Sequence, residues 1–180
     1  MLNFISRRRV AVAGAALAGA ALVGTATVAL GGPAVASDHP QVVAAQLDGS
    51  FIFHPCPAGT PAADLCLTDH ITTTLPGLGS VGGPFEVHIA FSSFAADGCG
   101  PIDKSGEFSA TDGSILRVRA TGLYCSASSI ATYDYRITGG TGKAQDASGS
   151  GIWLVPPPAT FSGSSGTGPE FFHGTLSIGD

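Results

Sequence analysis

Histidine and carboxylate side chains that alternate with apolar residues are the first candidates for chemistry in this chain. Glu86 and His88 lie opposite the apolar residues of one segment, as do His70 and His173 in two others. If that face lined a cavity, these groups could transfer protons or bind a metal. No two histidines have the local spacing of metal ligands, so we expect no metal and favour a solvated outer face. Glu86 and His88 are kept as candidates for an inward acid or base.

Five charged residues alternate with apolar neighbours in the same way: Glu86, Arg117, Arg119, Asp134 and Arg136. Cross-strand pairs on an outer face explain them, at about 0.2–1 kcal/mol per pair. The alternative is a buried polar cluster that serves a cyclase-like reaction. The sequence has no Gly-x-Ser-x-Gly nucleophile elbow. Gly142-Lys143 lacks the other residues of a phosphate-binding loop, so we expect no cofactor.

Aromatic side chains are the remaining candidates for ligand binding. Tyr133 and Tyr135 share a face with Ile137, which favours a place in the core. Trp153 alternates against Ile152 and Leu154, and at the mouth of a barrel it would be the best single indication of a binding site. We therefore name Trp153, Tyr133 and Tyr135, with Glu86 and His88, as the candidate ligand-binding residues.

These residues must be positioned by strands, because no segment after residue 36 has a convincing helical period. The alternation of apolar and polar residues and the placing of Gly, Pro and Asp predict eight strands. The predicted strands are 48–55, 67–75, 84–94, 106–111, 114–124, 130–138, 150–155 and 171–178.

The connections between these strands are mostly too short for a crossover helix, so neighbours should pair antiparallel. Eight sequential antiparallel strands leave two unpaired edges unless the sheet closes. We predict an all-β domain over residues 48–180, a single eight-stranded antiparallel up-and-down barrel of the calycin-like kind. A two-sheet sandwich is the alternative. Residues 37–47 are expected to be a flexible lead-in, with room for a short strand at 41–47.

The four cysteines predict two disulfides. Residues 111–114 predict a two-residue hairpin turn with Asp112-Gly113 at its tip. That hairpin brings Cys99 nearly opposite Cys125, one residue out of register, so a bulge is expected. Cys56 and Cys66 then close the proline-rich loop 55–65. A zinc site is disfavoured because no Cys-x-x-Cys spacing is present.

The N-terminus has the pattern of an export signal. Three arginines, residues 7–9, precede an apolar run over 10–30, and the small residues Ala34-Val35-Ala36 stand before Ser37. This pattern predicts a signal peptide over residues 1–36, cleaved after Ala36, and a secreted protein. A retained membrane anchor is the alternative, and the arginines also resemble a twin-arginine signal.

Charge excludes some partners. Removal of residues 1–36 leaves 144 of the 180 residues, with five basic against thirteen acidic side chains and a net charge of −8. A chain with this balance and no basic cluster is a poor partner for nucleic acid or an anionic membrane. We expect neither, once the signal peptide is removed.

The segment 136–143, Arg-Ile-Thr-Gly-Gly-Thr-Gly-Lys, followed by Ala-Ser-Gly-Ser-Gly at 147–151, resembles a motif of a known family. It is similar to the strand–turn–strand motif of dirigent proteins and of small exported bacterial proteins in the allene oxide cyclase-like barrel group. That family usually has Phe after the basic residue, where this chain has Ala144, so a cavity would be reshaped. The resemblance implies an eight-stranded barrel, often oligomeric in relatives, with an interior able to hold one apolar molecule. No catalytic residue carries over.

The expected function is that of a secreted, disulfide-stapled barrel, not an enzyme, that binds a small apolar ligand or acts at the cell envelope. A small cyclase or isomerase acting on a reactive intermediate inside the barrel is the alternative, and a structural protein with a filled barrel is a third. Binding alone predicts an almost wholly apolar cavity, whereas catalysis predicts an inward carboxylate, His or Tyr near a void.

Overall fold

In a computed structural model of the protein, the structure describes residues 40–179. The predicted signal peptide and residues 37–39 of the predicted lead-in lie outside the described residues. The described part consists of strands joined by turns and two short 3₁₀ segments, η1 (Phe91–Ser93) and η2 (Gly142–Ala144). The strands are β1 (Gln41–His54), β2 (Leu65–Leu75), β3 (Gly79–Ile89), β4 (Cys99–Ala110), β5 (Ile115–Cys125), β6 (Ile130–Thr141), β7 (Ser150–Val155), β8 (Thr160–Ser162) and β9 (Ser165–Leu176).

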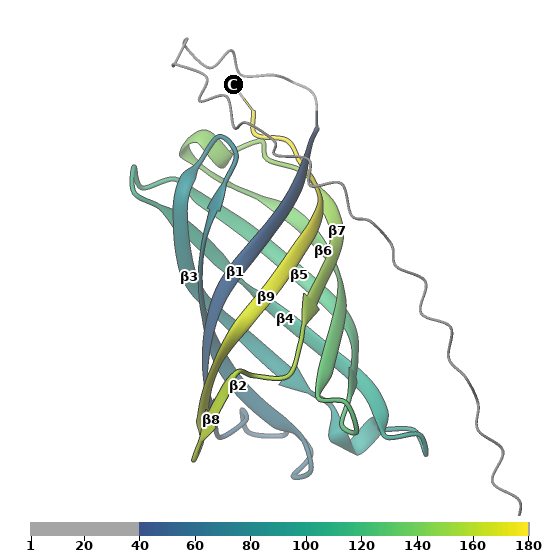
Figure 1. The fold of residues 1–180 in the computed structure, drawn as a ribbon. Helices are drawn as coiled ribbons and strands as arrows, with labels where there is room; N and C mark the ends of the chain where they lie inside the picture. The colour runs from purple at the N-terminus through teal and green to yellow at the C-terminus, as the bar shows by residue number, and fades with distance from the viewer. Residues whose placement is uncertain (1–39, 180) are drawn as a thin grey trace, which may run out of the picture. The chain divides into compact units, whose positions relative to one another are not determined.

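The strands form a closed antiparallel barrel (Figure 1). From β1 to β7, each strand pairs with the next in the chain. β7 then pairs with β9, and β9 pairs with β1 along twelve residue pairs, which closes the sheet. The short β8 pairs with β9 outside the ring of eight. The predicted all-β, eight-stranded up-and-down barrel is therefore confirmed, with one additional strand. Closure leaves no long unpaired edge among the eight strands.

β1, β4 and β9 begin well before the starts that the sequence indicated, β9 at Ser165 and not at Phe171. β1 begins at Gln41, so residues 41–47 belong to the barrel and pair with β9. Val43 and Leu47 point inward and are buried, which gives this half of β1 its place in the wall. β4 begins at Cys99, seven residues before the predicted start. Gly100 and Pro101 pair with β5 although both residue types have a low strand propensity, which is why the sequence did not indicate this half of the strand.

The turn between β4 and β5 differs from the prediction. The backbone N–H of Ala110 donates a hydrogen bond to the carbonyl oxygen of Ser114. The loop between these two residues therefore has three residues, not two. Gly113 has a φ of 85°, which suits the left-handed position of a three-residue hairpin loop. The extra residue changes the register, so Cys99 lies directly opposite Cys125 and no bulge is needed. The cysteines pair as predicted, Cys56 with Cys66 and Cys99 with Cys125.

Side chains pack one half of the interior densely. At the end of the barrel that carries the β2–β3 turn, the buried core includes Leu75, Leu78, Val81, Leu116 and Leu176. A layer of aromatic rings follows near the middle of the barrel. Trp153 has its ring centroid 5.3 Å from that of Phe85 and 5.4 Å from that of Phe172, edge to face in both cases.

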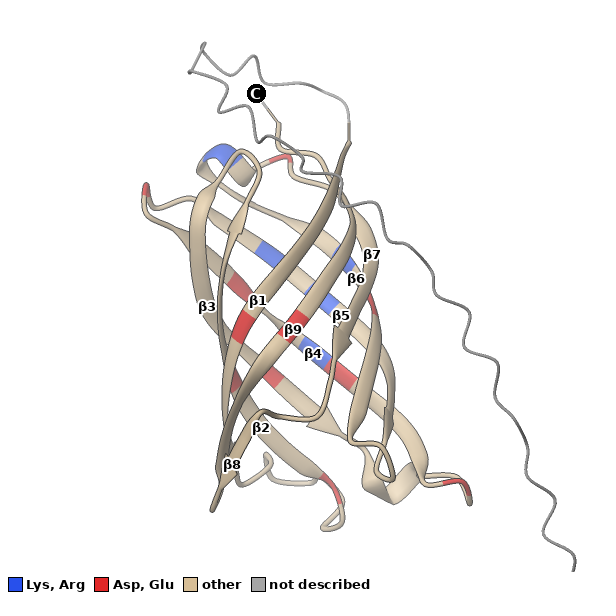
Figure 2. Ribbon diagram, viewed as in Figure 1, with Lys and Arg blue, Asp and Glu red and all other residues tan. Residues whose placement is uncertain are grey.

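Charged residues are scattered along the strands (Figure 2), and the outer surface also exposes large apolar side chains, among them Val42, Ile52 and Leu123. Glu107 lies opposite Arg117 across β4 and β5, and their side chains form an exposed ion pair of 2.8 Å. This is the kind of cross-strand pair that the sequence predicted for the outer face. Arg119 and Arg136 lie opposite each other on β5 and β6, both exposed.

Removal of each disulfide should lower the free energy of unfolding by an amount that depends on the loop it closes. The Cys99–Cys125 and Cys56–Cys66 bonds have sequence separations of 26 and 10. Loss of chain entropy in the unfolded state predicts costs of about 3.5 and about 2.7 kcal/mol, respectively, for the paired alanine variants. Chemical denaturation of the two double variants measures both costs. Stability equal to that of the unaltered protein would contradict the bracing role of these bonds.

Candidate functional site

A cavity of about 350 Å³ occupies the other half of the barrel, at the end that carries the disulfides. It lies between the inner faces of the eight strands of the ring, beside β8 and the segment that leads from β7 into β8. Its wall is mostly apolar and aromatic, with Phe51, Phe53, Leu67, Val87, Ile89, Ile102, Tyr124, Ala131 and Val155. A concave, mainly apolar site with few polar groups is typical of small-molecule binding.

The polar residues of the cavity meet at its inner end, where three strands each contribute one ionisable side chain. Lys104 of β4 donates hydrogen bonds to Asp69 of β2, at 2.5 Å, and to Glu170 of β9, at 2.9 Å. All three side chains are buried, with 1%, 6% and 5% of their surfaces exposed. We refer to Asp69, Lys104 and Glu170 as the interior charge cluster.

Trp153 connects the interior charge cluster to the aromatic layer. Its indole Nε1 donates a hydrogen bond of 2.6 Å to Glu170 Oε2, the oxygen that also accepts from Lys104. The Lys104 ammonium lies 4.2 Å from the centroid of the indole ring, within the range of a cation–π interaction. The tryptophan therefore stabilises one charge of each sign in the same cluster.

One fully buried oxygen of the cluster has no hydrogen-bond partner. Asp69 Oδ1 is buried and makes no hydrogen bond with any described residue. Gly49 of β1 leaves the space beside it open, because a Cβ at that position would lie 3.4 Å from Asp69 Oδ1 and 3.0 Å from Glu170 Oε1. The cavity thus offers a carboxylate oxygen that could accept a hydrogen bond.

The surroundings of Glu170 change its acidity. Burial raises the pKa of this carboxyl to about 7, with the nearby Lys104 ammonium opposing the shift and the Asp69 carboxylate adding to it. Burial and the same two carboxylates also raise the pKa of Tyr133 well above its usual range. At neutral pH the site therefore contains a protonated phenol and a carboxyl group poised between its two forms.

The structure places the predicted aromatic residues in different surroundings. Tyr133 lines the cavity. Trp153 is fully buried behind the interior charge cluster and not at the mouth. Tyr135 stacks on Phe172 with ring centroids 3.7 Å apart, away from the cavity, and its buried hydroxyl has no hydrogen-bond partner among the described residues. Burial raises the pKa of Tyr135 to about 12.

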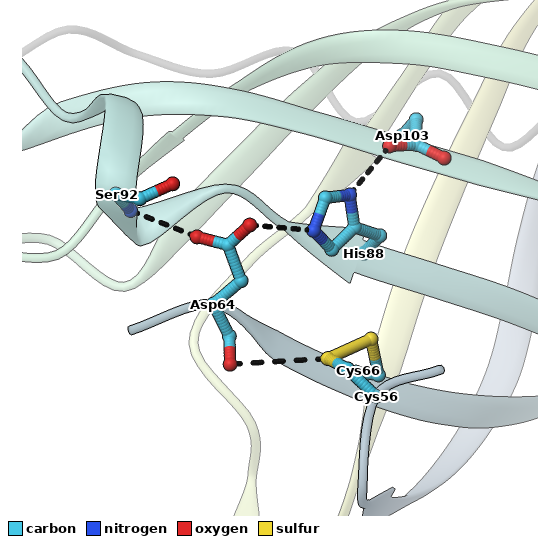
Figure 3. Close-up of polar contacts among 6 residues, drawn as sticks. All are labelled: Cys56, Asp64, Cys66, His88, Ser92 and Asp103. Atoms are coloured by element: carbon cyan, nitrogen blue, oxygen red, sulfur yellow. Dashed lines mark hydrogen bonds and ion pairs between the residues drawn. A yellow bond between two sulfur atoms is a disulfide. The ribbon is translucent and has the colours of Figure 1, made fainter. Parts of the chain in front are cut away.

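Glu86 and His88 lie on the outer face and are not brought to the cavity. The Glu86 side chain is 64% exposed and contacts His54, at 3.1 Å. His88 lies between two carboxylates, with its ring nitrogens 2.9 Å from Asp64 and 3.2 Å from Asp103 (Figure 3).

Asp64 fixes the loop of the Cys56–Cys66 disulfide to η1. Its buried carboxylate accepts the backbone N–H of Ser92 at 2.8 Å, and this bond lowers the pKa of the Asp64 carboxyl (Figure 3). Partial burial works against a charged His88, but the hydrogen bonds to Asp64 and Asp103 outweigh it and raise the imidazole pKa. These contacts hold a loop in place outside the barrel, which is a structural role.

Sequence reasoning missed the whole interior charge cluster. Asp69 alternates with Leu67 and Ile71, and Glu170 has the same parity as Phe172, so both carry a signal for an inward position. Lys104 fell in a predicted loop, because the first half of β4 was not recognised. The inward carboxylates that catalysis would require are therefore present, but they are Asp69 and Glu170 and not Glu86.

Comparison with protein-family models, with curated proteins and with solved structures finds no match for this chain. Within residues 40–179, no group of three or more His, Cys, Asp or Glu side chains could hold a metal ion. No helix in the same part of the chain is long and apolar enough to span a bilayer. The two disulfides indicate an oxidising, extracellular environment.

The raised pKa of Glu170 predicts a specific dependence of stability on pH. The folded state binds a proton at Glu170 below about pH 7, whereas the unfolded chain does so only below its usual value of 4.5. Stability from this group is therefore complete below pH 4.5 and is lost as the pH rises to about 7, by at most roughly 1.4 kcal/mol per pH unit. Glu170→Gln should lack this slope.

Denaturation of the unaltered protein and of Glu170→Gln between pH 5 and pH 8 measures the difference. We expect the two curves of stability against pH to converge or cross as the pH rises, with the unaltered protein losing more. Parallel curves would mean that Glu170 titrates normally.

Proposed function

We propose that this protein is a secreted small-molecule-binding barrel whose ligand has a mainly apolar body and one polar group. The observation that carries the proposal is the cavity of about 350 Å³, with apolar walls that end at a buried carboxylate oxygen without a partner. A volume of this size is at the lower end of the range for small-molecule sites. The contrast with the packed half of the same barrel argues against a purely structural, filled interior.

Export is part of the proposal. The arginines at 7–9, the apolar run at 10–30 and the Ala-x-Ala sequence at 34–36 support a cleaved signal peptide. The two disulfides agree with a destination outside the cytoplasm. The motif at 136–151 supports a relationship to the allene oxide cyclase-like barrel group, which also favours an interior ligand.

The mouth of the cavity supports entry of an apolar molecule. Phe161 of β8 is 59% exposed beside the opening, with its ring centroid 6.1 Å from that of Phe51 and 6.3 Å from that of Phe53. Aromatic rings that line an opening offer apolar surface to an entering ligand.

Binding can be tested with N-phenylnaphthylamine, a neutral apolar dye that fluoresces strongly away from water. We expect saturable binding of one dye per barrel. Ala131→Trp should weaken it by about tenfold or more, equivalent to about 1.4 kcal/mol, because Ala131 faces the cavity and the indole would fill it.

Thr132→Trp is the matched control, because Thr132 is the next residue of β6 and is exposed on the outer face. Its dye affinity should equal that of the unaltered protein. Equal weakening by both substitutions, or no saturable binding to the unaltered protein, would contradict the proposal.

A second candidate function is proton transfer to or from a bound molecule, and the raised pKa of Glu170 favours it. A carboxyl group with a pKa of about 7 beside an apolar cavity is suited to act as a general acid or base near neutral pH. In this function Glu170 is the proton carrier, Trp153 and Lys104 position its carboxyl group, and the cavity excludes water.

Nitrobenzisoxazole tests this second candidate. A base removes the C–H proton of the isoxazole ring, the N–O bond breaks to give a nitrile, and a coloured cyanonitrophenolate forms without any other reactant. We expect a rate that rises with pH through about 7 and falls on the order of 100-fold in Glu170→Gln. Glu107→Gln, on the outer face, should leave the rate unchanged. A rate that does not depend on Glu170 would exclude it as the base.

A further inference from the structure

The hydrogen-bond donors of the interior charge cluster are already used. Lys104 Nζ donates to Asp69 Oδ2 and to Glu170 Oε2, and its ammonium also lies against the indole ring of Trp153. Trp153 Nε1 donates to Glu170 Oε2. A ligand acceptor, such as a carbonyl or carboxylate oxygen, therefore finds no free donor on Lys104 or Trp153.

An acceptor, by contrast, is left over. Asp69 Oδ1 is buried beside the cavity and has no partner, although its side chain is only 6% exposed. A buried carboxylate oxygen without a hydrogen bond is unfavourable, since it has lost water and gained nothing in return. The internal group that could donate to it is the protonated form of Glu170, and a ligand donor would replace that proton.

The charges in the site also disfavour a ligand that carries a carboxylate. Two carboxyl groups, Asp69 and Glu170, face a single ammonium, Lys104, and the phenol of Tyr133 is neutral. A ligand carboxylate would add a further negative charge in a buried setting where charges are poorly screened. A neutral hydroxyl adds no charge, and a protonated amine balances the second carboxylate.

From the unpartnered oxygen and the excess of carboxylates, we infer that the ligand carries a hydrogen-bond-donating head group, a hydroxyl or a protonated amine, that binds Asp69 Oδ1. The apolar body of the ligand lies along the cavity wall toward the mouth. This inference rests on the proposed binding function and narrows the class of ligand: fatty acids and other carboxylates are disfavoured.

Four probes that share one apolar body test the inference: phenylbutanol, phenylbutylamine, phenylbutyrate and butylbenzene. Calorimetric titration of the unaltered protein should give affinities for the alcohol and the amine at least tenfold above that for butylbenzene. Phenylbutyrate should bind more weakly than butylbenzene. If the amine binds more tightly than the alcohol and Glu170 releases its proton on binding, the preferred head group is a cation. If the alcohol binds as tightly and no proton is released, the preferred head group is a hydroxyl. Both outcomes support the inference.

Asp69→Asn tests whether Asp69 Oδ1 accepts the hydrogen bond from the ligand head group. Its amide oxygen would keep the contact with Lys104 and place an NH₂ group where Asp69 Oδ1 was, so the alcohol and the amine should lose at least tenfold in affinity while butylbenzene does not change. Asp134→Asn, the same substitution on the outer face of β6, is the matched control and should change none of the four affinities. The comparison among probes uses the unaltered protein, so it stands even if Asp69→Asn does not fold.

The outcomes separate the two proposals. If none of the four probes binds, the proposed binding function is wrong and the inference fails with it. If all four bind with similar affinity, or phenylbutyrate binds most tightly, the binding function stands and the head-group inference is overturned.

Discussion

Burying a lysine ammonium with two carboxyl groups in the middle of a barrel is the constraint on which the rest of this interior depends. An ion taken out of water loses several kcal/mol of solvation, which only close partners and hydrogen bonds can offset. Lys104 obtains those partners in Asp69 and Glu170, and Trp153 supplies both a donor and a ring face. Burial, with the Asp69 carboxylate nearby, disfavours the charged form of Glu170 more than the single ammonium favours it, so the pKa of Glu170 is raised to about 7.

The cluster also divides the barrel into two halves that are stabilised differently. On one side, the apolar core packs the barrel out to the β2–β3 turn. On the other side lies the cavity. Both disulfides lie at this hollow end, as does the Asp64–His88 contact that holds the first disulfide loop. Covalent and polar braces thus take the place of the missing core and keep the mouth in shape.

The fold was largely predictable from the sequence, whereas the site was not. Alternation along β3, β5 and β6 identifies strands with one buried face, and that regular signal is enough to predict a closed antiparallel barrel. The interior charge cluster breaks the same rule, because its members occupy inward positions where the pattern calls for apolar side chains. Lys104 follows Gly100 and Pro101, which suppress the strand signal of the first half of β4. Such a residue becomes visible only when three strands distant in sequence are brought together.

The most direct test of this account is a carbon NMR titration of the Glu170 carboxyl group, with and without phenylbutylamine. We predict a midpoint near pH 7 in the free protein, because burial beside Asp69 disfavours the charged form of Glu170. We predict a lower midpoint when the amine is bound, because an added positive charge favours the carboxylate. A midpoint near 4.5 that does not move with the amine would contradict both the raised pKa of Glu170 and the place of the interior charge cluster in a ligand site.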